Sequence, residues 1–343
     1  MDLSLLDGLS FVCRPDCGLC CYAEPQVSPA ERQQLLQILP EVEVVRRGKR
    51  EFLAAHADGG ACRLLRDHRC RAHRARPAPC REYPLTVHVG ARLQATAVLS
   101  CPGVDLSGLE RFPWRESGGA AKGFPAELAA LRVRVDRSTA RRLEASARRR
   151  RKVIRTLQAG DRWKEETEVR EDLGRAMPWP TSSEFPVADP PLADEGMENL
   201  PLFFDGRDGP VALARAIGGW ELLELRPEGG VARSLGVLPG PDRPPRLHPE
   251  AESVLRGYLR YWLARDALFG IVHLKMVAST GGTVSEWVDA ELRTIGALVL
   301  ARAEVRAKLR RGAVDRLSPA ELLDGIRATD QDLLDRDGWG DRL

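Results

Sequence analysis

Eight cysteines are the strongest chemical signal in this sequence of 343 residues. All of them lie in the first 101 positions, and four fall within nine residues on a stretch that also contains proline and glycine. Short spacings bring sulfur atoms together with little loss of chain entropy, and thiolates select zinc, copper(I) or iron–sulfur clusters. We therefore predict a cysteine-ligated metal site, with the candidate ligands Cys13, Cys17, Cys20, Cys21, Cys62, Cys70, Cys80 and Cys101.

Packing and disulfide roles fit these cysteines less well. A lone cysteine is usually a small buried hydrophobe, and this stays a close alternative for Cys62 and Cys101 taken singly. We find neither a secretory signal nor a run of about 18 apolar residues that could span a membrane. We expect a cytoplasmic protein, and in that reducing compartment clustered cysteines indicate metal or catalysis before disulfides. Neighbouring Cys20 and Cys21 point apart in extended backbone, so one of them could lie outside the ligand set.

Two more motifs accompany the first cysteine group. The full set is Cys13-x3-Cys17-x2-Cys20-Cys21, then Cys70, Arg76-Pro77-x-Pro79-Cys80-Arg81-x-Tyr83-Pro84 and Ser100-Cys101-Pro102-Gly103. Over residues 11–105 this arrangement resembles the CxxxCxxCC cysteine-cluster family, the YkgJ type of zinc- or iron-chelating domain. The resemblance implies metal chelation and no particular reaction. The metal stays open between an iron–sulfur cluster, with 4Fe-4S preferred, and zinc, because all-cysteine ligand sets serve both.

Residues beside the candidate ligands could assist the metal. Pro77 and Pro79 fix φ and stiffen the approach to the cysteine that follows them. Arg81 either places a cation beside a thiolate-rich centre or is an ordinary surface charge. His68 and His73 flank another candidate ligand and could replace a thiol in a zinc site, but their arginine-rich surroundings favour solvated surface histidines.

Whether the chain is an enzyme stays open at this stage. The Ser100-Cys101-Pro102 ending, the segment from Tyr258 to Asp266 and the helix that follows Leu317-Ser318 give a further, weaker likeness. In layout they are similar to flagellin lysine N-methylases, which join an N-terminal cysteine cluster to a helical region. That resemblance implies S-adenosylmethionine-dependent lysine methylation as an alternative function, although no glycine-rich nucleotide loop stands out. The first three cysteines also have the spacing of radical S-adenosylmethionine enzymes, but the repeated strand–helix alternation of those enzymes is missing. We expect foremost a metal-binding protein whose C-terminal domain engages a protein partner or substrate.

The sharp end of the cysteine distribution suggests how the chain is divided. We predict a metal-binding domain over residues 1–115, a basic helical connector over 116–175 and a C-terminal domain over 176–343. The fold class is α+β: a small, loop-rich, metal-stabilised cysteine domain, followed by short antiparallel strands and a bundle of about three helices. A turn-rich segment has little apolar core, so ligation should supply folding free energy, on the order of 10 kcal/mol for zinc.

Periodicity and turn residues predict the individual elements. A helix should begin after the N-cap Ser28, and a β-hairpin over 86–99 should turn at Gly90. A proline-rich linker is expected over 177–191. The remaining predictions are helices over 124–157, 250–276, 284–309 and 319–334, and strands over 202–204, 211–216, 220–225 and 231–238.

The first of these long helices concentrates positive charge. From Arg132 to Arg155 the sequence has eleven Lys or Arg against two Asp or Glu, whereas the whole chain has a net charge of only +3. Such a segment could bind RNA, DNA or an acidic partner, but it contains no aromatic residue to stack on bases. A solvated helix face is the default expectation, and nucleic-acid binding is less favoured.

Overall fold

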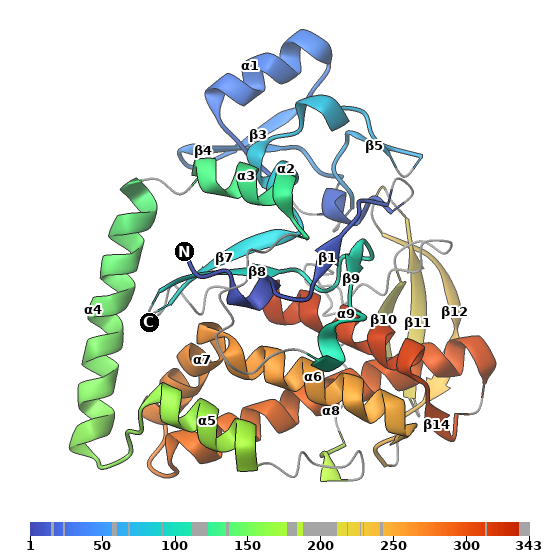
Figure 1. Cartoon of the computed structure of the whole chain (residues 1–343). Helices are drawn as coiled ribbons and strands as arrows, with labels where there is room; N and C mark the ends of the chain where they lie inside the picture. The colour runs from blue at the N-terminus through green and yellow to red at the C-terminus, as the bar shows by residue number, and fades with distance from the viewer. Residues whose placement is uncertain are drawn as a thin grey trace.

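The computed structural model shows an α+β protein, as predicted. The cysteine-rich N-terminal elements lie at the top of Figure 1, the C-terminal helices at the bottom, and a β-hairpin between them. The structure describes residues 1–14, 17–22, 25–56, 60–67, 69–90, 92–111, 123–134, 137–176, 184–187, 211–217, 219–226, 228, 230–240, 243–312 and 314–335.

The upper part, which we call the cysteine lobe (described residues between 17 and 82), consists of short elements. Its first helix begins as predicted: the Ser28 side chain accepts a hydrogen bond from the Glu31 backbone, and the Glu31 carboxylate accepts one from the Ser28 backbone. The elements are η2 (Leu19–Tyr22), β2 (Gln26–Val27), α1 (Pro29–Ile38), β3 (Val44–Arg47), β4 (Arg50–Leu53), β5 (Leu65–Arg66), β6 (Arg69–Cys70), η3 (His73–Ala75) and α2 (Ala78–Glu82).

The cysteine lobe has a small apolar core of its own. Strands β2, β4 and β3 form an antiparallel sheet in that order, and β5 pairs with β6. So few buried side chains contribute little folding free energy, which agrees with a lobe that depends on ligation. The buried members of this core are Cys21, Val27, Leu35, Val42, Leu53, Cys62, Leu64 and Ala72.

The hairpin predicted over 86–99 is confirmed. Strands β7 (Leu85–Val89) and β8 (Leu93–Ala97) pair antiparallel, with Val89 opposite Leu93, so the turn includes Gly90. On one side lies η1 (Ser4–Leu6), and further on β1 (Ser10–Phe11) pairs with β9 (Val104–Asp105), which precedes η4 (Leu109–Arg111). Of these elements, η1 and β1 come before the cysteine lobe in the sequence, and the hairpin, β9 and η4 come after it.

Seven further helices follow in the described part of the chain. The segment predicted as one helix over 124–157 forms two, and residues 135 and 136 between them lie outside the described residues. The predicted 250–276 helix is likewise divided, so four helices, not about three, make up the C-terminal bundle. The helices are α3 (Pro125–Arg134), α4 (Arg137–Ala159), α5 (Glu166–Ala176), α6 (Pro249–Ala264), α7 (Asp266–Val277), α8 (Val284–Arg311) and α9 (Pro319–Asp335).

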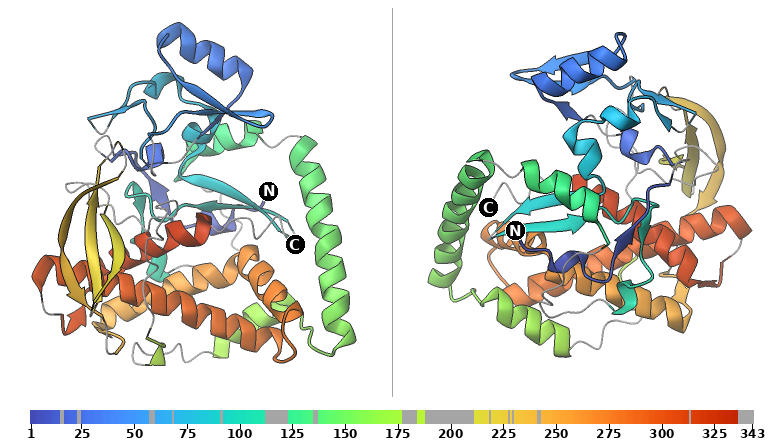
Figure 2. Two further views of the ribbon diagram at one scale, coloured as in Figure 1. Left: turned by 180° about the vertical axis from the view of Figure 1, so that it is seen from behind. Right: turned by 45° about the horizontal axis from the view of Figure 1, so that its top comes forward.

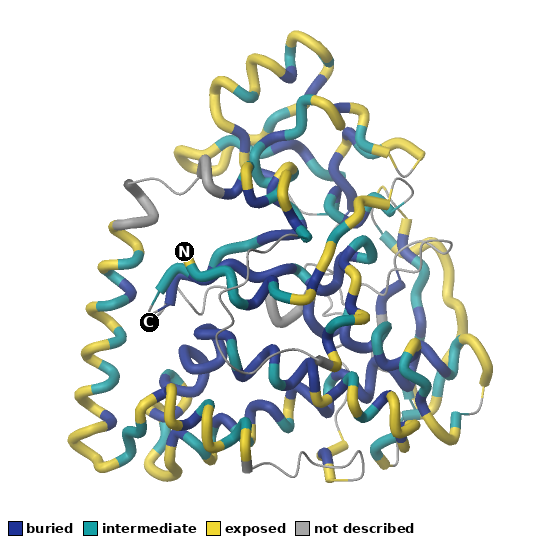
Figure 3. Tube along the Cα trace, viewed as in Figure 1, coloured by how far each residue is buried: buried dark blue, intermediate teal, exposed yellow. Residues whose placement is uncertain are grey.

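One large apolar core joins the hairpin to the C-terminal helices. Leu5 and Ala95 from the N-terminal part belong to the same buried cluster as Tyr258, Trp262 and Leu300. This core therefore crosses the boundary that we predicted at residue 115. The dark, buried stretches of the helices in Figure 3 face this shared interior.

The division between α6 and α7 occurs at Arg265. Its backbone is extended (φ −76°, ψ 128°), which interrupts the helical ladder and leaves backbone groups without their usual partners. The buried side chain of Gln94 on β8 replaces these partners: its Nε2 donates to the Ala264 carbonyl at 3.1 Å, and its Oε1 accepts from the Asp266 N–H at 2.9 Å. The hairpin thus supplies the hydrogen bonds that make the break tolerable.

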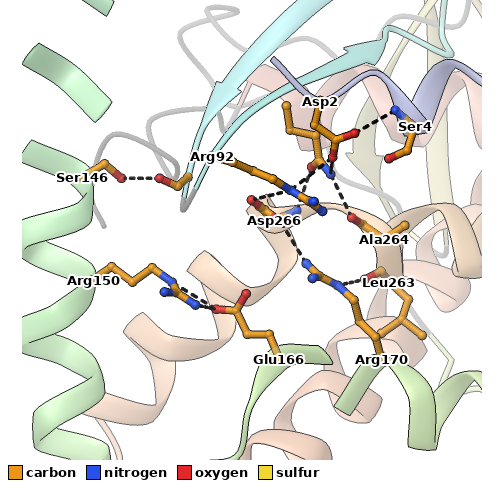
Figure 4. Close-up of polar contacts among 12 residues, drawn as sticks. Asp2, Ser4, Arg92, Ser146, Arg150, Glu166, Arg170, Leu263, Ala264 and Asp266 are labelled. Carbon is orange, nitrogen blue, oxygen red and sulfur yellow. Dashed lines mark hydrogen bonds and ion pairs between the residues drawn. The ribbon is translucent and has the colours of Figure 1, made fainter. Parts of the chain in front are cut away.

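Charged groups surround the same break (Figure 4). Buried Asp266 forms ion pairs with Arg170 of α5 at 2.9 Å and with Arg92 of the hairpin at 3.5 Å. Arg92 also pairs with Asp2 at 3.1 Å. The N-terminal segment, the hairpin, α5 and the start of α7 therefore meet at one polar junction.

A separate sheet packs on the ends of α8 and α9. Strands β10 (Val211–Ala216), β11 (Gly219–Leu225) and β12 (Val231–Pro239) form the predicted antiparallel meander, and Trp220 and Leu222 pack on Val305. Two short strands, β13 (Arg246–Leu247) and β14 (Arg316–Leu317), pair in parallel. The predicted strand over 202–204 and the linker over 177–191, except residues 184–187, lie outside the described residues. Among described helices, none combines the length and apolar character that a membrane span requires.

Candidate metal centre

Most of the cysteines surround one cavity. The cavity has a volume of about 410 Å³ and lies where the cysteine lobe meets β1 and the loop before β9. All eight cysteines are free thiols. Those that line the cavity are Cys13, Cys17, Cys20, Cys21, Cys70, Cys80 and Cys101.

The first group of thiols is arranged by a tight turn. Gly18 has a positive φ of 64°, which L-residues with side chains rarely adopt, and its carbonyl accepts a hydrogen bond from the Cys21 N–H at 2.9 Å. The backbone N–H of Leu19 donates to the Cys17 sulfur at 3.4 Å. Cys20 and Cys21 lie on the 3-10 turn η2, and both line the cavity. The expectation that neighbouring side chains diverge applies to extended backbone, which this segment does not have.

The remaining thiols come from three different elements. Cys70 lies on β6 and Cys80 on the short helix α2, whose N-cap is Pro77. Cys101 follows β8, and its N–H donates to the Val98 carbonyl at 3.1 Å in a turn that directs the chain toward β9. The motif after Pro77 thus folds as a short helix.

Cys62 is the cysteine that does not line the cavity. It is buried at 5% exposure in the small core of the cysteine lobe, and its N–H donates to the Cys21 carbonyl at 2.6 Å. It therefore supports the first cysteine group from behind through its backbone. Its surroundings in this apolar core are those of a packing residue, the alternative that we kept for Cys62.

Cations stand on the cavity wall, but Arg81 is not one of them. Its guanidinium reaches Glu31 at 3.5 Å and the Arg76 carbonyl, because α2 presents residue 81 to the side of α1. The wall cations are Arg14, Arg69 and Arg76. Arg76, the first residue of the Arg-Pro-x-Pro-Cys-Arg motif, is therefore the motif's cation beside the thiols, and not Arg81, its last residue.

Of the two histidines considered as ligands, His73 lines the cavity. Burial and the neighbouring Arg76 lower the pKa of His73, which favours the neutral imidazole that a metal requires. The prediction of a solvated surface position holds in part, because the residue is exposed as a whole. His68 lies outside the described residues.

The thiols influence one another electrostatically. A hydrogen bond with the Cys21 thiol lowers the pKa of Cys70 to about 6, and the same thiol lowers that of Cys20. Burial raises the pKa of Cys80 and of Cys101 to about 12. Metal ligation displaces thiol protons, so metal affinity at these buried cysteines should rise with pH.

Two aromatic side chains complete the wall. Phe11 of β1 stacks on Phe124 with a centroid distance of 6.2 Å. Tyr83 lines the cavity from the segment that follows α2. Burial and the nearby Cys101 sulfur raise the pKa of Tyr83, whose hydroxyl forms a hydrogen bond with that sulfur. Tyr83 belongs to the motif read from the sequence, but the contribution of Phe11 had no sequence signal.

No three histidine, cysteine or carboxylate side chains converge as a single-ion site among the residues that the structure describes. The thiols are distributed around the cavity instead. Neither the curated proteins nor the solved structures include a significant match to this chain. A family model does match: the matched segment begins just before Cys13 and ends just after Cys101, so it contains every cysteine. Residues 12–102, which supply the cavity thiols, thus match the CxxCxxCC family, described as "Putative zinc- or iron-chelating domain".

Proposed function

We propose that this protein holds an iron–sulfur cluster, with 4Fe-4S preferred, in the cysteine-lined cavity. The observation that carries the proposal is the distribution of seven thiols around a space of about 410 Å³. A structural zinc ion takes four ligands at about 2.3 Å from one point, which uses neither this volume nor this number of thiols. A cluster spreads its four thiolates around a larger inorganic core. The cytoplasmic setting that we predicted would keep these thiols reduced.

The surroundings of the cavity also support a cluster. Ligand thiolates would come from both cysteine groups, and Arg14, Arg69 and Arg76 would offset the negative charge of the centre. Phe11 and Tyr83 reduce solvent access and dielectric constant at the wall. When bound, such a cluster supplies one-electron transfer, with a potential set by these charges, hydrogen bonds and exposure.

Anaerobic purification followed by iron, sulfide and zinc analysis and a visible spectrum tests this proposal. We expect a brown protein with stoichiometric iron and sulfide. Cys70→Ser and Cys80→Ser should each lower iron content at least about tenfold, because each removes a thiol from the wall. Cys62→Ala is the matched control, since Cys62 is buried near the cavity but does not line it, and it should retain iron. A colourless protein with stoichiometric zinc would contradict the cluster, and iron that survives both serine variants would exclude Cys70 and Cys80 as its ligands.

We also propose that the helical region engages an acidic protein partner through α4. This helix stands at the edge of the molecule in Figures 1 and 2, and its outward side is exposed in Figure 3. Arg150 turns inward to Glu166 at 2.6 Å, and Leu157 is buried. The exposed cations cover the other side: Arg141, Arg142, Arg148, Arg149, Arg151, Lys152 and Arg155. Such a concentrated positive face attracts an acidic surface at low ionic strength.

Binding of the full chain to polyglutamate, measured at increasing salt, tests the α4 surface. We expect a triple variant, Arg148→Gln with Arg149→Gln and Arg151→Gln, to weaken binding and to flatten its salt dependence. Neutralising the exposed Arg46 and Arg50 of the cysteine lobe serves as the control for lost charge elsewhere. Equal binding by the triple variant and this control would refute the surface. If duplex DNA retained the protein more tightly than polyglutamate does, the partner of α4 would be a nucleic acid and not an acidic protein.

A further inference from the structure

Helix α9, at the far end of the described chain, holds the loop that carries Cys101. Arg327 donates from Nη1 to the Cys101 carbonyl at 2.6 Å and from Nη2 to the Val104 carbonyl at 3.0 Å. Three residues further along the helix, the Asp330 carboxylate accepts a hydrogen bond from the Leu99 N–H at 2.8 Å. The two side chains of α9 therefore grip the loop on both sides of this cysteine.

The side chain of Cys101 is held by Tyr83, which also lines the cavity. The Tyr83 hydroxyl forms a hydrogen bond with its sulfur, while the Cys101 carbonyl accepts the Val104 N–H at 3.0 Å in addition to Arg327. Cys101 itself is only 5% exposed. Arg327 of α9 thus holds the Cys101 backbone, and Tyr83 holds its sulfur. Together these contacts restrict the orientation of the thiol.

The guanidinium of Arg327 brings charge as well as geometry. Arginine is planar and carries its donors in a fixed fork, which suits simultaneous contact with two neighbouring carbonyls. Its positive charge lies beside Cys101, because its Nη1 contacts the carbonyl of that residue at 2.6 Å. A cation beside one ligand of a cluster stabilises the reduced form, whose negative charge is larger.

We infer that Arg327 is a positioning residue for the Cys101 ligand and raises the reduction potential of the centre, an inference that rests on the proposed cluster. The metal site thus extends beyond the matched segment 12–102 into α9. Two variants separate the two effects. Arg327→Gln removes the fork and the charge, whereas Arg327→Lys keeps the charge on a group that cannot reach both carbonyls in the same geometry.

The first measurement is the alkylation rate of Cys101 in metal-free full-length protein, followed by mass spectrometry. We expect an increase on the order of tenfold in Arg327→Gln, because the loop opens more often once its hydrogen bonds are lost. Alkylation of Cys13, which is already exposed, should not change. Arg256→Gln, an exposed arginine on α6, is the matched control. An unchanged Cys101 rate in both Arg327 variants would overturn the positioning role.

The second measurement is the reduction potential of the loaded protein. We expect a lower potential in Arg327→Gln and recovery toward the wild-type value in Arg327→Lys, a pattern that loss of packing alone would not produce. A potential that does not move in Arg327→Gln would overturn the electrostatic part. If the protein binds no iron while Cys101 still becomes reactive, the proposed cluster fails and the positioning role stands. Circular dichroism of each variant establishes that the helices remain folded.

Discussion

Replacing Asp330 with alanine is expected to lower the free energy of unfolding by about 3–5 kcal/mol, because it leaves a buried cation without its counter-ion. Arg265 and Asp330 are both 0% exposed, and their charged groups lie 3.2 Å apart. The Arg265 guanidinium is also stacked over Tyr261 and Trp262, at 4.4 and 4.3 Å from the ring centroids. Although burial opposes it, the Asp330 carboxylate holds the pKa of Arg265 above its ordinary value, so the arginine stays charged.

Urea unfolding followed by circular dichroism, at fixed metal content, measures this loss. Asp315→Ala removes an exposed carboxylate near the same helix and should change stability by no more than about 0.5 kcal/mol. Removing both charges in an Arg265→Met, Asp330→Leu double variant should recover part of the loss, because no buried charge is then left unpaired. A single Asp330→Ala variant within about 1 kcal/mol of wild type would show that water or another group compensates Arg265.

Removal of the metal is expected to unfold the cysteine lobe while the C-terminal helices stay folded. The lobe has a small core that includes Cys21 and Cys62, whereas the large core around Trp262 contains a single cysteine, Cys101, among many buried apolar side chains. Structural metal sites contribute on the order of 10 kcal/mol to small domains, far more than such a core can replace. Limited proteolysis should therefore cut metal-free protein within the lobe and spare α6 to α9.

Hydrogen exchange of the same samples gives the control within one chain. Amides of α1 and β4 should lose protection on metal removal, whereas amides of α8 should keep it. The Cys70→Ser variant should show the metal-free pattern even before treatment. Equal protection of α1 with and without metal would mean that the lobe folds without ligation.

The sequence was most informative where the chemistry is local. The spacing of Cys13, Cys17 and Cys20, and the Pro77 to Cys80 segment, identified a metal-chelating arrangement that the cavity and the family match support. Local spacing could not tell Arg76 from Arg81, because the difference depends on which side of α2 faces the thiols. It also could not separate Cys62 from the other candidates, because its burial depends on the packing of the whole lobe.

The helical half shows the limit of periodicity. Apolar spacing continues through residues 250–276, and nothing in that segment marks a break at Arg265. The break depends on Gln94, 170 residues earlier in the chain than Ala264, and on Asp330 beyond it. The core shared by Leu5, Ala95 and Trp262 was also not visible in the sequence, because contacts between distant segments leave no local pattern.

The grip of α9 on the Cys101 loop has a consequence for biosynthesis. The hydrogen bond from Arg327 spans 226 positions of the chain. While the protein is being made, the segment with all eight cysteines leaves the ribosome long before α9 exists. Until α9 is made, the Cys101 carbonyl lacks its hydrogen bond from Arg327, so the backbone at this thiol is less restrained. Completion of the proposed metal centre thus waits for translation of α9.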